Sequence, residues 1–78
     1  MDNQKKIIEE IADNLALPLT DLELNADLKN DLGLSPIEIA DLFESLAEKF
    51  NITFDRGEIE QILAVKDLVE LIEDKLLE

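Results

Sequence analysis

The chain has 78 residues, which suits one small domain, and we expect that domain to span residues 1–78. It contains neither cysteine nor histidine, so disulfides, zinc-thiolate sites and histidine acid–base chemistry are excluded. Its 20 Asp and Glu against 7 Lys and Arg give a formal charge of −13, which disfavours nucleic acid and anionic membranes as partners. No apolar run approaches the ~20 residues needed to cross a bilayer, so we expect a cytoplasmic protein without membrane insertion.

Three segments place apolar residues at spacings of three and four, the pattern of an amphipathic helix. These segments are Asn3–Leu15, Pro36 to Lys49 or Phe50, and Val65–Leu76. Asp55 followed by Glu58 has the spacing of a capping box and predicts a short helix that ends at Gln61 or Ile62. The sequence therefore predicts an all-α fold, a small four-helix bundle of three longer helices and one short helix.

Two connections between these helices have no helical period. Residues 17–34, "LPLTDLELNADLKNDLGL", form a long loop that we expect to bury four leucines, and a long loop in a small domain is often functional. The four are Leu22, Leu24, Leu28 and Leu32. In the later connection, Ile52 and Phe54 alternate with polar residues as in a strand. Because no other segment offers a strand partner, we expect a loop with buried anchors.

A capping signature opens the second long helix. Ser35 stands at the N-cap position, Pro36 at the first helical position and Glu38 at the third. Proline loses no hydrogen bond there, because an N–H at that position has no acceptor within the helix. The pattern predicts that the Ser35 side chain accepts a hydrogen bond from a first-turn amide.

From Asp31 to Glu48, a stretch that includes most of the second helix, the charged residues have a single sign, since no Lys or Arg occurs there. Four acidic residues share the face opposite its apolar stripe: Glu38, Asp41, Glu44 and Glu48. A run of charges is usually only a solvated face, but such a face normally mixes both signs. We expect this one to dock the basic surface of a partner, in a salt-sensitive association.

The order of these pieces resembles the acyl carrier protein family over nearly the whole chain. The resemblance is strongest in "DLGLSPIEIADLFESLAEKFNITF" and in "EIEQILAVKDLVELIE", and it rests on the joint spacing of their residues. It implies a carrier without catalytic activity, in which a serine opening the second helix holds 4'-phosphopantetheine. The thiol of that group carries an acyl or related group, as in fatty acid or polyketide biosynthesis. The implied partners are phosphopantetheinyl transferase and acyl-processing enzymes, and we expect a monomer.

The chain departs from the family's pattern at the attachment site. The family's motif reads glycine, any residue, usually Asp, and then the modified serine. Counted from Gly33, Ser35 stands where Asp is usual, and Pro36, which has no hydroxyl, stands where the modified serine belongs. Either Ser35 carries the group one residue early, or the group is lost and the domain is an acidic docking or regulatory module. A stand-alone interaction bundle without any link to carrier enzymes is the hypothesis from a different class.

Two further classes of acidic protein fit the sequence poorly. Twelve-residue windows that begin at Asn25, Asp27, Asp31 and Asn51 do not combine the glycine and glutamate of a calcium loop. A hydrolase with two catalytic carboxylates needs a cleft, which we do not expect in so small a chain. We therefore predict no catalytic residues and no metal site.

Overall fold

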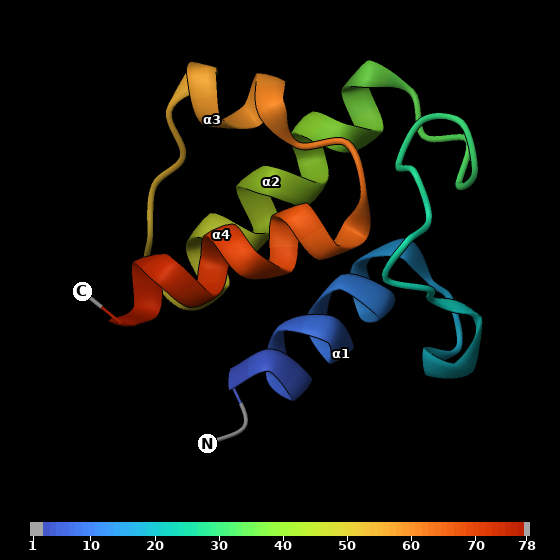
Figure 1. Cartoon of the computed structure of the whole chain (residues 1–78), viewed down its shortest axis with the longest axis horizontal. Helices are drawn as coiled ribbons and strands as arrows, with labels where there is room; N and C mark the ends of the chain where they lie inside the picture. The colour runs from blue at the N-terminus through green and yellow to red at the C-terminus, as the bar shows by residue number, and fades with distance from the viewer. Residues whose placement is uncertain (1–2, 78) are drawn as a thin grey trace.

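The structure, a computed structural model, describes residues 3–77. The order of its elements is α1 (Asn3–Leu15), a 3-10 turn η1 (Leu19–Asp21), α2 (Pro36–Phe50), α3 (Arg56–Gln61) and α4 (Val65–Leu77). Helix α1 packs against both α2 and α4, and the short α3 lies at the opposite side of the molecule from α1 (Figure 1). The prediction of a small all-α bundle with three longer helices and one short helix is confirmed. None of the described helices is long and apolar enough to cross a membrane.

The observed helix boundaries agree with the predicted ones, except that α4 ends at Leu77 instead of Leu76. Helix α2 ends at Phe50 because the next residue, Asn51, adopts a left-handed conformation with φ 56°, which asparagine tolerates better than most residues. The Ile52 N–H then donates to the Ala47 carbonyl oxygen at 3.0 Å, which turns the chain away from the helix axis. The segment that follows is a loop, as predicted.

The core lies between the three long helices and takes one apolar stripe from each. Its buried residues are Ile7, Ile11, Ala12, Leu22, Leu28, Leu42, Phe43, Leu46, Val65, Leu68, Val69 and Ile72. Full burial of a large apolar side chain contributes about 1.5–3 kcal/mol, so these stripes account for most of the cohesion of the bundle. Helix α3 contributes no fully buried residue, which leaves it at the edge of the core.

The long first loop covers one end of the core, and three of the four leucines predicted to be buried there do contact the core. The prediction for Leu24 is wrong. Leu22 and Leu28 are buried and Leu32 is partly buried, as expected. Leu24, in contrast, is 37% exposed. Its backbone makes the contact instead, because the Leu24 carbonyl oxygen accepts the N–H of Lys66 at 2.8 Å, at the start of α4.

The same loop is joined to the linker between α3 and α4 by backbone hydrogen bonds. The Leu28 N–H donates to the Leu63 carbonyl oxygen at 2.9 Å, and the Val65 N–H donates to the Ala26 carbonyl oxygen at 3.0 Å. These bonds flank an isolated antiparallel bridge between Asp27 and Ala64. The loop that leads into α2 is therefore held against the linker that leads into α4.

Candidate functional site

The start of α2 has the predicted capping box. The Glu38 N–H donates to Ser35 Oγ at 3.2 Å, and the Ser35 N–H donates to Glu38 Oε1 at 2.8 Å. Pro36 occupies the first helical position, between these two bonds. Gly33 prepares this arrangement with a left-handed backbone, φ 69°, after which the Leu34 N–H returns to the Leu28 carbonyl oxygen at 3.1 Å.

The Ser35 hydroxyl fits covalent attachment of a phosphopantetheine group, while Pro36 does not. Ser35 and Pro36 are both exposed at the surface. A serine hydroxyl offers one donor and two acceptor lone pairs, and Ser35 Oγ uses a lone pair for the cap. Its proton is left for transfer to a base during phosphoester formation. Pro36 has no atom that could form the ester, and a phosphate at Ser35 would lie at the positive end of the α2 dipole.

An apolar groove of about 780 Å³ opens beside Pro36 and runs between α2 and α3. Its apolar lining consists of Pro36, Ile39, Ala40, Phe43, Ala47, Ile52, Phe54, Ile59, Ile62 and Leu63. The charged residues that line it are Lys29, Glu44 and Glu60, and all three are exposed. The groove is large enough for a small-molecule ligand, since ligand pockets are commonly about 300–1,000 Å³.

Sequence reasoning missed this groove, because no cleft was expected in a chain of this size. The available signal was the pair Ala40 and Ala47, one heptad apart beside the apolar stripe of α2. Two small side chains on one side of a helix leave space that larger residues would fill. Across that space, Ile59 of α3 and Ile62, which follows the helix, stay only partly buried.

Two aromatic rings line the groove, and a lysine lies beside one of them. The rings of Phe43 and Phe54 meet edge to face, with centroids 5.0 Å apart and planes at 71°. Lys75 Nζ lies 5.9 Å from the Phe54 ring centroid and contacts Glu58 Oε1 at 3.0 Å. The pKa of Glu58 lies below its ordinary value of 4.5, chiefly because its carboxylate accepts the Asp55 N–H and next because it accepts a hydrogen bond from Lys75.

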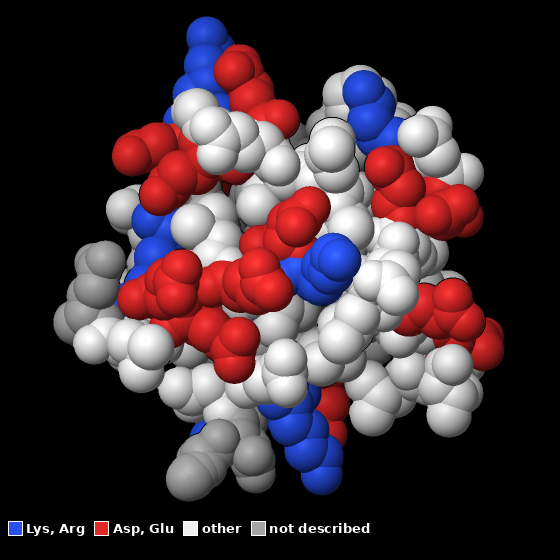
Figure 2. All heavy atoms as spheres, viewed as in Figure 1, with Lys and Arg blue, Asp and Glu red and all other residues white. Residues whose placement is uncertain are grey.

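The four predicted docking residues form an exposed acidic ridge along α2, comprising Glu38, Asp41, Glu44 and Glu48. Glu44 lines the apolar groove on one side of the ridge. Glu38 and Asp41 line a smaller hollow of about 330 Å³ on the other side, which Asn14 and Leu15 of α1 also line. Within residues 3–77, no Lys or Arg makes an ion pair with the ridge. Acidic side chains also outnumber basic ones on the face seen in Figure 2.

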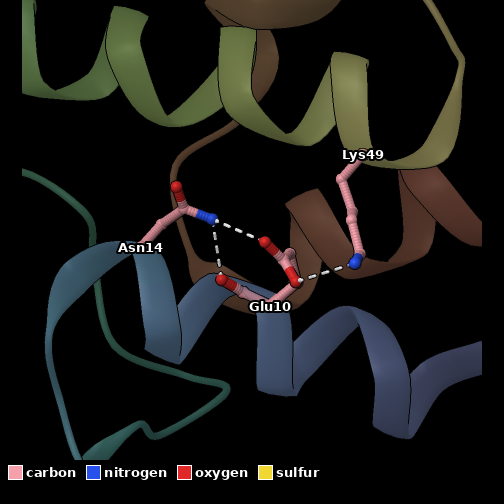
Figure 3. Close-up of polar contacts among 3 residues, drawn as sticks. All are labelled: Glu10, Asn14 and Lys49. Carbon is pink, nitrogen blue, oxygen red and sulfur yellow. Dashed lines mark hydrogen bonds and ion pairs between the residues drawn. The ribbon is translucent and has the colours of Figure 1, made fainter.

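The basic residue at the end of α2, Lys49, interacts with α1 instead of the ridge (Figure 3). Lys49 Nζ lies 4.0 Å from Glu10 Oε1, and the lysine side chain is 60% exposed. Asn14 Nδ2 donates to the Glu10 carbonyl oxygen at 2.8 Å and to Glu10 Oε2 at 3.3 Å. An exposed pair at this distance contributes little stability, because solvent screens it.

The described residues contain no group of three or more acidic, histidine or cysteine side chains placed to hold a metal ion. Ser45, the other serine of the chain, lies in the middle of α2, where it lines the hollow beside Asp41. The site therefore consists of the Ser35 cap, the apolar groove beside it and the acidic ridge.

Comparison with known proteins gives concordant matches over most of the chain. Residues 5–72 match the family described as "Phosphopantetheine attachment site". The acyl carrier protein of Coprothermobacter proteolyticus is 31% identical over 77 residues, covering 94% of each chain. That of Amoebophilus asiaticus is 32% identical over 74 residues, covering 95% of this chain and 92% of the other.

Among solved structures, the fold matches the apo doublet acyl carrier protein from prodigiosin biosynthesis with a TM-score of 0.75 and 25% sequence identity. The match covers 94% of this chain and 35% of the doublet, so the chain spans about a third of that protein.

Proposed function

The chain belongs to the phosphopantetheine-attachment family of acyl carrier proteins and is a carrier, not an enzyme, and on this premise we propose that Ser35 is its attachment point. The bound 4'-phosphopantetheine supplies a thiol that holds an acyl group as a thioester for presentation to partner enzymes. The observation that carries the proposal is the exposed Ser35 at the N-terminus of α2 beside the apolar groove, whose Oγ accepts the Glu38 N–H and donates no hydrogen bond within residues 3–77.

Attachment at Ser35 is compatible with the cap that this residue already forms. The Glu38 N–H donates to Ser35 Oγ at 3.2 Å in the unmodified chain. Phosphate oxygens at a helix N-terminus are good acceptors for first-turn amides, so the Glu38 N–H keeps a partner after esterification. Glu38 Oε1 continues to accept the Ser35 N–H, which holds the backbone of the attachment residue in place.

The apolar groove is the part of the site that suits a hydrocarbon cargo. It begins at Pro36, the residue after the proposed attachment point, and its lining is mostly apolar. Burial of apolar area in such a groove lowers the free energy of the chain that enters it, by ~25 cal/mol for each Å² removed from water. We therefore assign the groove to the acyl chain.

We further propose that the acidic ridge docks basic surfaces of phosphopantetheinyl transferase and acyl-processing enzymes. The ridge is exposed, and within the described residues it makes no ion pair that a partner would have to break. Complementary charge accelerates association and orients the partner at the start of α2. The fatty acid or polyketide pathway, the cytoplasmic location and the monomeric state remain predictions.

Pro36 favours a second candidate function. A proline at the position where the family places its modified serine fits a domain that keeps the docking surface but has lost the prosthetic group. Such a domain would bind carrier enzymes through the same acidic ridge and deliver no cargo. The two candidate functions differ only in whether the Ser35 hydroxyl carries phosphopantetheine. In the second, the domain is an unmodified docking or regulatory module.

Intact-mass spectrometry after incubation with coenzyme A and a broad-specificity phosphopantetheinyl transferase distinguishes the two. Loading at Ser35 predicts a gain of one phosphopantetheine on the wild type and on the matched control Ser45→Ala, and no gain on Ser35→Ala. A wild type that gains nothing while Pro36→Ser is loaded would overturn attachment at Ser35 and leave the docking module. If neither chain is loaded, the claim that the ridge docks the transferase also fails.

A further inference from the structure

We propose that Lys75 is the positioning residue that holds α3 over the apolar groove, so that its ion pair with Glu58 controls how readily the groove opens to an apolar chain. The proposal rests on the proposed function in one respect, the use of the groove as the acyl site. The geometry itself concerns only the unmodified chain.

Helix α3 is the weakly held wall of the groove. It has six residues, Arg56–Gln61, and none of them is fully buried. Its apolar contact with the core comes from Ile59, and Ile62, the residue after the end of the helix, adds to it; both are partly buried and line the groove. An element with little buried apolar area opens at a lower free-energy cost than the core helices, so a single strong contact changes its position substantially.

Lys75 makes that contact from the last turns of α4. Its Nζ lies 3.0 Å from Glu58 Oε1 and 3.1 Å from Oε2, and the side chains are only 19% and 32% exposed. Glu58 Oε1 also accepts the Asp55 N–H at 2.9 Å, at the start of α3. Because these charges are partly shielded from solvent and hydrogen-bonded, their pairing is stronger than that of an exposed surface pair. One carboxylate thus joins α4 to the beginning of α3.

The same lysine lies beside one of the aromatic rings that line the groove. Its Nζ lies 5.9 Å from the Phe54 ring centroid, a distance at which a cation is attracted to the ring. Phe54 packs edge to face on Phe43, and both rings line the groove. When α3 moves away from the groove, the ion pair between Lys75 and Glu58 has to break. This pair lies beside Phe54, a ring that the cargo would contact.

The other ion pair in the described residues provides a matched control. Lys49 and Glu10 join α1 to α2 at 4.0 Å, away from the groove, and Lys49 is 60% exposed (Figure 3). Helices α1 and α2 are already packed through their buried stripes, so the loss of this pair removes a lysine charge without loosening a wall of the groove.

The test is amide hydrogen exchange on the full, unloaded chain, with Lys75→Met compared with Lys49→Met. Methionine keeps an unbranched apolar side chain and removes the ammonium group, with both its charge and its hydrogen bond to Glu58. We expect the Ile59 and Ile62 amides, which donate to the Asp55 and Ile59 carbonyl oxygens, to exchange about fivefold faster in Lys75→Met. Amides within α1 and α2 should exchange as in the wild type, and Lys49→Met should leave α3 unchanged.

A second variant, Glu58→Gln, keeps an oxygen for the Asp55 N–H and removes the charge, so it should reproduce Lys75→Met, while Lys75→Arg should restore slow exchange. Unchanged α3 exchange in both charge-removing variants, or an equal increase throughout the chain, would overturn the proposal. The association rate of Nile red with the unloaded chain should rise by a similar factor in Lys75→Met, and no rise would overturn the link to groove access. All of these experiments use the chain without phosphopantetheine. Their results therefore do not depend on whether Ser35 can be loaded.

Discussion

Ser35 and Glu38 hold each other through two reciprocal hydrogen bonds, in which the Glu38 N–H donates to Ser35 Oγ at 3.2 Å and the Ser35 N–H donates to Glu38 Oε1 at 2.8 Å. The hydroxyl proposed for attachment therefore also starts α2. Its contribution to stability and its contribution to loading can be separated, because other side chains cap a helix without carrying a hydroxyl.

Ser35→Ala should lower the free energy of unfolding by about 1 kcal/mol, since the Glu38 N–H loses its acceptor. Ser35→Asp should keep wild-type stability, because an aspartate carboxylate caps as well as a serine, but it should not be loaded. Urea denaturation followed by circular dichroism measures the stabilities. If Ser35→Asp is as unstable as Ser35→Ala, the cap is not the source of the difference.

The two glycines should respond to alanine in opposite directions. Gly33 has φ 69°, and an added Cβ would meet nothing within 4 Å, so Gly33→Ala should cost about 1 kcal/mol through backbone strain alone. Gly57 lies within α3, and a Cβ there also meets nothing within 4 Å. Gly57→Ala should stabilise the chain by about 0.5–1 kcal/mol, because glycine is a poor helix former. Thermal unfolding midpoints of the two variants should therefore lie on either side of the wild-type value.

Asp67 should make part of the stability dependent on pH. Its Oδ2 accepts the Ala64 N–H at 3.0 Å and the Leu63 N–H at 3.2 Å. The pKa of Asp67 lies below its ordinary value of 3.8, mainly because of the Ala64 bond, although partial burial opposes this shift. Folding thus favours the charged carboxylate, and this contribution is present above the unfolded-state pKa and is lost as pH falls through the folded-state pKa.

The measurement is the difference in free energy of unfolding between the wild type and Asp67→Asn. That difference should be constant near neutral pH and should shrink below about pH 4 as Asp67 is protonated. Taking a difference matters, because acid also relieves the repulsion among the other acidic side chains, which the two proteins share. Glu70→Gln, at an exposed position of the same helix, is the control and should show no such decline. A difference that persists into acid would contradict the prediction.

Charge reversal on the acidic ridge should weaken docking. Asp41→Lys combined with Glu44→Lys should reduce affinity for a phosphopantetheinyl transferase by about tenfold at low salt, and the loss should diminish as salt rises. The matched control is Glu9→Lys with Asp13→Lys, which makes the same change in net charge on exposed positions of α1. Surface plasmon resonance at two salt concentrations checks this. Equal losses in both double variants would show that net charge, not the ridge, governs association.

The local features of the site were predictable from short spacings. The capping box at Ser35 depends on residues within one turn of each other, so its effect does not require knowledge of the rest of the fold. The same is true of the acidic charge between Asp31 and Glu48. Leu24 shows where this reasoning fails, because a loop without a period gives no indication of which of its leucines face the core, and Leu24 is 37% exposed.

The sequence alone determined the helices and their ends, because apolar period and capping spacing are properties of neighbouring residues. It also showed that Pro36 stands at the position where the family has its modified serine. Only the tertiary structure revealed the groove, since a cavity is the space left between side chains of separate elements. It also placed Lys75 on Glu58, 17 residues away. No spacing rule links the end of α4 to the start of α3, and their contact exists because the bundle packs both against the same core.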